Sequence, residues 1–79
     1  MSEYNRLNKL NKKQIDNAIN ILTFEDVQNI TFGEDIEISE NVVLSHYCED
    51  DIITLNLLDS WTEIYQVMTD DKKIILETI

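Results

Sequence analysis

The sequence predicts an α+β fold in which two N-terminal helices precede an antiparallel sheet of four to five strands. Two observations lead to this class. Apolar residues recur at steps of three and four through roughly the first 30 positions, which indicates helices. Later runs are short and rich in β-branched and aromatic residues, and Asn, Asp and Ser separate them, as in strands joined by tight turns. A chain of 79 residues has room for one core, so residues 1–79 are treated as a single acidic α+β domain.

The first helix is expected from Tyr4, Leu7 and Leu10, which stand three residues apart. It would begin after Ser2, as its cap, extend to about residue 13 and present a basic face. The next segment, 15–22, fits both one face of a helix and an alternating strand. The residues leave that choice open.

A second, short helix is expected from Phe24 to about Ile30. Thr23 stands three residues before Asp26, which resembles a capping box, and Gly33 is a residue that can end the helix. Strand formers dominate from there on. The first three strands are expected near 35–38, 42–47 and 52–58.

The last segment allows two interpretations. Residues 64–68 and 74–76 flank the polar stretch 70–73, which predicts a hairpin with a four-residue turn. Alternatively, 61–79 forms a helix that starts with a capping box. We prefer the hairpin because β-branched and aromatic residues are frequent in this segment.

The charged residues are segregated along the chain. Between Gln14 and Asp71 there are 14 acidic residues and no Lys or Arg; the six basic residues lie at the two ends, and the net charge is −10. A surface of one sign repels itself, so we expect a cationic partner to favour it. Nucleic acids and anionic membranes are bound through Lys and Arg, which this block lacks. The sequence therefore predicts a basic protein as partner, and neither a nucleic acid nor a membrane.

The residues offer no complete catalytic constellation. His46 and Cys48 are the only His and Cys, whereas a structural zinc site needs four ligands. A single glycine is too few for a glycine-rich phosphate loop. We therefore expect no enzyme activity, no metal and no cofactor. One cysteine cannot form an internal disulfide, and the sequence shows neither a signal peptide nor a membrane segment, which favours the cytoplasm.

Several local patterns resemble the phage uracil-DNA glycosylase inhibitor family, and the similarity extends over about residues 14–76. Lys-Gln-Ile at 13–15 resembles the lead into the family's first strand. Leu-Thr-Phe-Glu-Asp-Val at 22–27 resembles the start of its second helix. Residues 43–50 resemble its second strand, which ends in a tyrosine and an acidic loop. The family's last three strands are matched in order by 53–55, 61–68 and 73–76.

The resemblance implies a phage or mobile-element protein that evades host defence by mimicking DNA in the cytoplasm of a bacterial host. In that family, a first-strand carboxylate and acids of the second helix contact the DNA groove of the glycosylase. An apolar pocket between helix and sheet takes up a leucine of the enzyme. By position, the implied acidic contacts here are Asp16, Glu25, Asp26, Glu49, Asp50 and Asp51. The implied pocket residues are Leu22, Val27, Ile30, Val43, Leu55 and Val67.

We therefore expect a monomer that forms a 1:1 complex with uracil-DNA glycosylase and occupies its DNA-binding groove. Two alternatives stay open. One is an acidic inhibitor of another DNA-binding protein, such as a restriction or CRISPR nuclease or a transcription factor. The other is an immunity-type protein that neutralises a basic partner. Some residues also have a purely structural explanation: the pocket residues as core, Asp26 as a helix cap, and Trp61 and Tyr65 as either core or interface.

Overall fold

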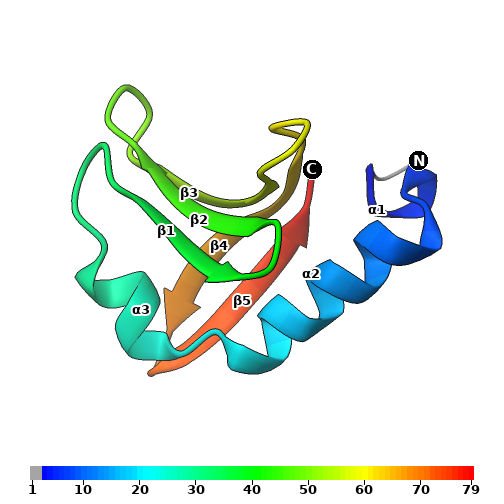
Figure 1. The fold of residues 1–79 in the computed structure, drawn as a ribbon. Coiled ribbons are helices and arrows are strands. Elements are labelled where there is room, and N and C mark those ends of the chain that lie inside the picture. Colours follow the sequence, from blue (N-terminus) through cyan, green and yellow to red (C-terminus); the bar gives the residue numbers. More distant parts are fainter. Residues whose placement is uncertain (1–2) are drawn as a thin grey trace.

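The computed structural model describes residues 3–79, so the expected cap at Ser2 lies outside the described residues. Three helices, α1 (Glu3–Arg6), α2 (Lys9–Ile21) and α3 (Phe24–Asn29), precede a five-stranded antiparallel sheet (Figure 1). The α+β class predicted from the sequence is confirmed. None of the described helices has the length and apolar character needed to cross a membrane.

The segment that the sequence left open is helical. Residues 15–22 form the second half of α2 and its C-cap, so the single helix expected to end near residue 13 is divided instead into α1 and α2. Asn8 caps α2, and its side chain accepts a hydrogen bond of 2.8 Å from the backbone N–H of Asn11. The helical period prevails because it places Ile15, Ala18 and the C-cap Leu22 together in the core.

Helix α3 begins with the predicted capping box. The N–H of Asp26 donates to Thr23 Oγ1 at 3.2 Å, and the N–H of Thr23 donates to Asp26 Oδ2 at 3.0 Å. The helix ends at Asn29, with Ile30 as its C-cap, so the expectation that Gly33 ends it is wrong. Gly33 has φ of 79° in the turn before the first strand, and its N–H donates to the carbonyl of His46 at 2.7 Å.

The sheet is a simple meander in which each strand pairs with the next along the chain. The preferred hairpin is confirmed, but its turn is shorter than expected. Asp70 pairs with Lys73, which leaves Asp71 and Lys72 in the turn, both with positive φ as in a type I′ turn. The strands are β1 (Asp35–Ser39), β2 (Val42–Tyr47), β3 (Ile52–Leu57), β4 (Glu63–Asp70) and β5 (Lys73–Thr78).

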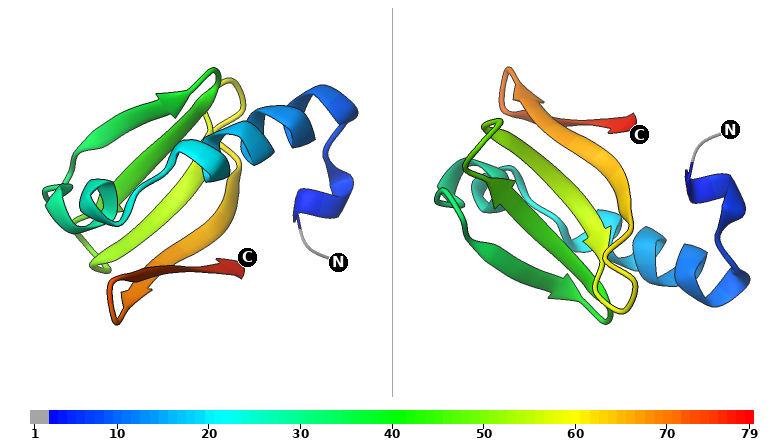
Figure 2. Two further views of the ribbon diagram at one scale, coloured as in Figure 1. Left: turned by 90° about the horizontal axis from the view of Figure 1, so that it is seen from below. Right: turned by 90° about the horizontal axis from the view of Figure 1, so that it is seen from above.

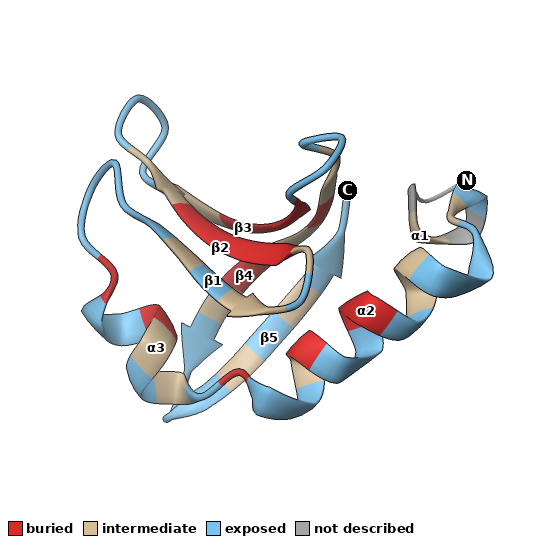
Figure 3. Ribbon diagram, in the orientation of Figure 1, coloured by how far each residue is buried: buried red, intermediate tan, exposed pale blue. Residues whose placement is uncertain are grey.

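Helices α2 and α3 cover one face of the sheet, and the opposite face carries no helix (Figure 2). The core lies between the helices and the covered face, and α2 together with the strands β2, β3 and β4 contributes its most buried residues (Figure 3). At the margin, α1 packs beside β4, where the rings of Tyr4 and Tyr65 have centroids 6.1 Å apart.

Candidate partner-binding surface

The meander gathers acidic residues at one end of the sheet. In antiparallel strands the start of β1, the β2–β3 turn and the β4–β5 turn must all lie at the same end. Each of these segments is rich in Asp and Glu, and Asp is favoured in turns. We call this the acidic end; its acids are Glu34, Asp35, Glu49, Asp50, Asp51, Asp70 and Asp71.

The carboxylates of the acidic end face solvent with little internal neutralisation. All seven acids are exposed. Among the described residues, the one ion pair that they make joins Asp51 to His46, over 2.8 Å. Lys72 and Lys73 occupy the same end, in and after the β4–β5 turn, while the N-terminal half of α2, with its lysines, extends beyond the opposite end (Figure 1). The surface is thus strongly anionic on one side of the molecule.

His46 holds the acidic end together. Its Nδ1 lies 3.2 Å from the carbonyl oxygen of Ile30, and its Nε2 lies 2.8 Å from Asp51 Oδ1. The ring of Phe32 lies over it, with centroids 4.5 Å apart. The His46 side chain is 12% exposed whereas that of Asp51 is 71% exposed. The partly buried His46 therefore connects the α3–β1 loop to the β2–β3 turn. Sequence reasoning assigned it no such role.

Two of the acids on the helices already have internal partners. Asp26 closes the capping box of α3, as the structural explanation held. Asp16 accepts a hydrogen bond of 2.8 Å from the hydroxyl of Tyr4, and this bond is the main reason that the pKa of Tyr4 is raised. Asp16 lies on α2, so its expected place on a strand is wrong; the helical burial of its neighbour Ile15 decides the conformation.

The other predicted acids remain available. Glu25, in the first turn of α3, is exposed, as are Glu49 and Asp50 in the β2–β3 turn. None of these three side chains hydrogen-bonds or forms an ion pair with the part of the chain that the structure describes. Of the six predicted acidic contacts, these three are therefore free to bind a cationic partner.

A groove of about 420 Å³ lies between α3 and the ends of β3 and β4. Three of the predicted pocket residues line this α3 groove: Val27 and Ile30 from the helix side, and Val67 from the sheet. Ile53 and Met68 add apolar surface. The groove opens beside the acidic end, because His46 and Asp51 also line it, along with Gln28, Ile52, Gln66 and Thr69.

The other three predicted pocket residues lie elsewhere. Leu22 and Leu55 are buried in the core and do not line the groove. Val43 is also buried, but it lies on the helix-free face, so its expected place in the pocket is wrong. Side chains alternate along a strand, and Val42 and Leu44 on either side of it point into the core.

The helix-free face is built around a buried polar residue that sequence reasoning missed. Asn56, in β3, has no exposed surface. Its side-chain oxygen accepts from Thr54 Oγ1 at 2.8 Å, and its Nδ2 donates to Ser45 Oγ at 3.1 Å and to Tyr47 Oη at 3.3 Å. Tyr47 Oη also accepts from Trp61 Nε1 at 3.0 Å. The network fixes the positions of both aromatic rings on this face.

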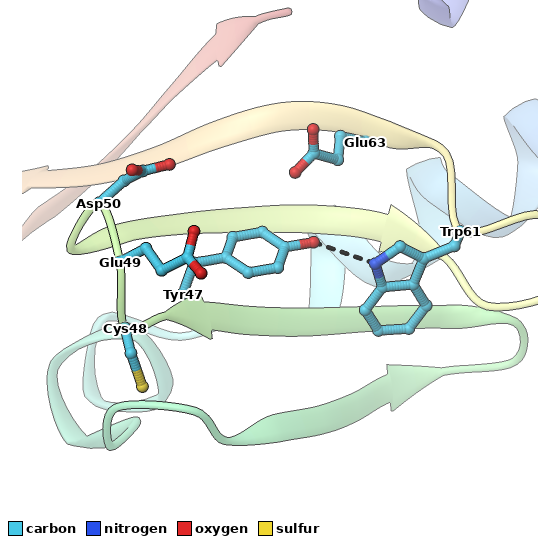
Figure 4. A pocket seen from close by; sticks show the side chains of 6 residues that line it. All are labelled: Tyr47, Cys48, Glu49, Asp50, Trp61 and Glu63. Carbon is cyan, nitrogen blue, oxygen red and sulfur yellow. Dashed lines mark hydrogen bonds between the residues drawn. The ribbon is translucent and has the colours of Figure 1, made fainter.

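Beside this network lies a cavity of about 630 Å³, which we call the Trp61 pocket (Figure 4). The Tyr47 and Trp61 side chains meet through their hydrogen bond, and carboxylates from the β2–β3 turn and from β4 lie around them. Figure 4 shows the sulfur of Cys48 directed away from the carboxylates. The residues that line the pocket are Tyr47, Cys48, Glu49, Asp50, Trp61 and Glu63.

A smaller cavity of about 220 Å³ adjoins the Trp61 pocket. The two share Tyr47, Asp50 and Glu63 as lining residues. Within the described residues, no group of three or more His, Cys, Asp or Glu side chains is arranged to hold a metal ion. The two cavities together form a hollow with aromatic and carboxylate walls on the helix-free face.

No protein-family model matches the chain, and no curated protein or solved structure matches it either. The resemblance to the glycosylase inhibitors therefore stands on the local sequence patterns alone.

Proposed function

We propose that this chain is a DNA-mimicking protein inhibitor that occupies the DNA-binding groove of uracil-DNA glycosylase. The observation that carries the proposal is the acidic end, where exposed carboxylates in turns and at strand ends have little neutralisation by cations. The accessible acid of α3, Glu25, extends the anionic surface beside it. The sequence resemblance selects uracil-DNA glycosylase among the proteins that bind DNA.

Rigid carboxylates can replace phosphates in a protein groove. Neighbouring strands lie about 4.8 Å apart, so the strand ends and the turns that join them hold these acids close together at one end of the sheet. DNA presents one charge per roughly 1.7 Å of its axis to the Lys and Arg residues that bind it. A dense and ordered anionic surface therefore attracts the same groove and accelerates association through electrostatic steering.

The α3 groove supplies the second part of the proposed interaction. The resemblance implies that an apolar side chain of the enzyme enters a pocket between helix and sheet, and the groove has Val27, Ile30 and Val67 in that position. Burial of one such side chain contributes roughly 1.5–3 kcal/mol, and this contribution does not depend on salt as charge pairing does. We therefore expect a complex that dissociates slowly even at moderate salt.

The test is uracil excision from a labelled single-stranded oligonucleotide by a bacterial uracil-DNA glycosylase, with this protein added at low and at moderate salt. We expect inhibition to be complete near one equivalent of the protein and to persist at moderate salt. If excision continues unchanged at a large molar excess, the assignment of this target is wrong.

A comparison of two double variants tests whether the acidic end is the surface that binds the enzyme. Glu49→Gln with Asp50→Asn removes two free carboxylates of the acidic end, whereas Glu40→Gln with Asp59→Asn removes two exposed ones near the opposite end. Both changes reduce the net charge equally. We expect the first pair to weaken inhibition at least about tenfold and the second to change it little. Equal weakening would mean that overall charge, and not this surface, determines binding.

One departure from the family pattern favours a second target class. The resemblance implies a carboxylate on a first strand, but segment 9–21 is a helix. Its acid, Asp16, accepts a hydrogen bond from Tyr4. A mimic with this geometry suits another DNA-binding protein, such as a restriction or CRISPR nuclease or a transcription factor. Inhibition of one of these in a panel that includes the glycosylase, with the glycosylase unaffected, would establish the alternative.

A further inference from the structure

We propose that the Trp61 pocket is a binding site for an arginine side chain presented by a protein partner. The identity of that partner as a DNA-binding protein rests on the proposed function, whereas the affinity of the pocket for a guanidinium group does not. The pocket is on the helix-free face, apart from the α3 groove, so it would add a contact of a different kind from the insertion of an apolar side chain.

The walls of the pocket combine the two kinds of group that a guanidinium binds. Glu49, Asp50 and Glu63 supply carboxylates, and no Lys or Arg is among the described lining residues. Tyr47 and Trp61 supply aromatic rings. A planar guanidinium can stack on an aromatic ring while its N–H groups donate to a carboxylate in the same plane, which a compact ammonium cannot do.

The aromatic part of the pocket is held in place before any ligand arrives. Trp61 is 41% exposed, so part of its ring is open to solvent, yet its Nε1 is fixed by the hydrogen bond to Tyr47 Oη. Tyr47 is fixed in turn by Asn56, which is fully buried. Because these side chains are already ordered, binding costs little conformational entropy.

The position of Glu63 depends on an irregularity in the sheet. The pairing of β3 with β4 shifts by one residue: Leu55 pairs with Tyr65, but Asn56 pairs with Glu63. Ile64, between them on β4, has no partner on β3, and its side chain is buried in the core. The shift places the Glu63 side chain on the same face as Asn56 and the pocket (Figure 4). An acid is thereby located across the pocket from the β2–β3 turn.

Charge complementarity identifies the occupant. The pocket is anionic, partly aromatic and large enough for a side chain, and the protein that carries it has a net charge of −10. The chemistry is that of an arginine, and neither an acidic nor a purely apolar side chain would compensate the three carboxylates. The geometry therefore assigns a cationic residue of the partner to this face.

The capped tripeptide acetyl-Gly-Arg-Gly-amide tests the pocket with this protein alone. Trp61 is the only tryptophan, so its fluorescence reports on this site directly. At low ionic strength we expect a saturable change with a dissociation constant of about 1 mM, as a single-side-chain contact allows. The Lys analogue should bind more weakly, and the Gln analogue should give no saturable change.

Two variants that each remove one negative charge distinguish binding in the Trp61 pocket from a general attraction of the Arg tripeptide to the anionic protein. Glu63→Gln should weaken binding of the Arg tripeptide about tenfold, because it removes one charge-assisted contact. Glu40→Gln, which removes an exposed acid outside the pocket, should leave the dissociation constant within about twofold. If Glu63→Gln disturbs the fold, Glu49→Gln in the exposed turn carries the same expectation.

The proposal is overturned if the Arg tripeptide gives no saturable change, if the Gln analogue binds equally well, or if Glu40→Gln weakens binding as much as Glu63→Gln. Because no glycosylase is present in this experiment, these outcomes are independent of whether the chain inhibits that enzyme.

Discussion

Asn56 is a fully buried amide on the sheet face that no helix covers, and it binds three other side chains. Replacing it with Ala should lower the free energy of unfolding by about 2–3 kcal/mol, because the hydroxyls of Thr54 and Ser45 would be left buried without this partner. Urea unfolding followed by circular dichroism measures the change. Asn17→Ala, at an exposed position of α2, is the control and should cost less than about 0.5 kcal/mol. A loss below that value for Asn56→Ala would contradict a structural role for the network.

Two tyrosines beside Asp16 make the stability depend on alkaline pH. The hydrogen bond to Asp16 raises the pKa of Tyr4, and burial followed by the charge of Asp16 raises the pKa of Tyr65, both from the ordinary value of 10.0. The folded state therefore holds these protons more tightly than the unfolded state. Their contribution is fully present below pH 10.0 and is lost as the pH rises through the higher folded-state values.

The prediction is a decrease in the free energy of unfolding as the pH is raised above about 10. Urea unfolding at a series of alkaline pH values measures it. The double variant Tyr4→Phe and Tyr65→Phe should show a smaller decrease than the unmodified chain. An identical decrease in both would show that groups other than these two tyrosines determine the alkaline behaviour.

At the scale of elements, the capping box of α3 connects stability to the candidate surface. Thr23→Ala removes the acceptor for the N–H of Asp26 and should lower the free energy of unfolding by about 1 kcal/mol. Because α3 forms one wall of the α3 groove, the same change should increase hydrogen exchange in α3 more than in β2 or β3. Uniform exchange throughout the molecule would contradict a local role for the cap.

The elements could be predicted where local chemistry determines them. The strands, the hairpin and the capping box follow from residue preference and from turn residues within a few positions. Segment 15–22 could not be assigned, since Ile15 and Ile19 satisfy both periods. In the structure α2 makes a contact that local sequence does not reveal: Gln14 Oε1 accepts a hydrogen bond of 3.0 Å from the side chain of Asn41, 27 residues away.

The candidate site was predictable to a smaller extent. The acids of the β2–β3 turn, and Val27, Ile30 and Val67 of the groove, were identified by their positions in the family resemblance. The Trp61 pocket was not identified. It depends on the register shift in β4 and on the buried Asn56, and both arise from pairing between strands.

At the scale of the whole molecule, the anionic surface should cost stability. Raising NaCl from 10 mM to 1 M shortens the Debye length from about 30 Å to about 3 Å and so screens repulsion among the exposed acids. We expect the free energy of unfolding, measured with urea, to increase by about 1 kcal/mol. The charge-reduced variant Glu40→Gln with Asp59→Asn should increase less. A stability that is independent of salt would mean that the acids do not repel one another appreciably.

This predicted loss of stability fits the proposal that the acidic surface binds a cationic partner. Exposed carboxylates on the acidic end and on α3, together with the groove beside them, would be compensated only when a cationic partner is bound. The Trp61 pocket would add a specific contact for one residue of that partner. A bound cationic partner would then both contact the exposed acids and reduce the repulsion among them.

The most direct test of the central claim is competition with DNA. Fluorescently labelled DNA is bound to a bacterial uracil-DNA glycosylase, and its anisotropy is followed as this protein is added. DNA mimicry predicts that the anisotropy falls to the value of free DNA near one equivalent of the protein, and that excess unlabelled DNA slows formation of the protein complex. If the protein binds the enzyme while the DNA stays bound, or if it displaces no DNA at a large excess, it is not a DNA mimic for this enzyme.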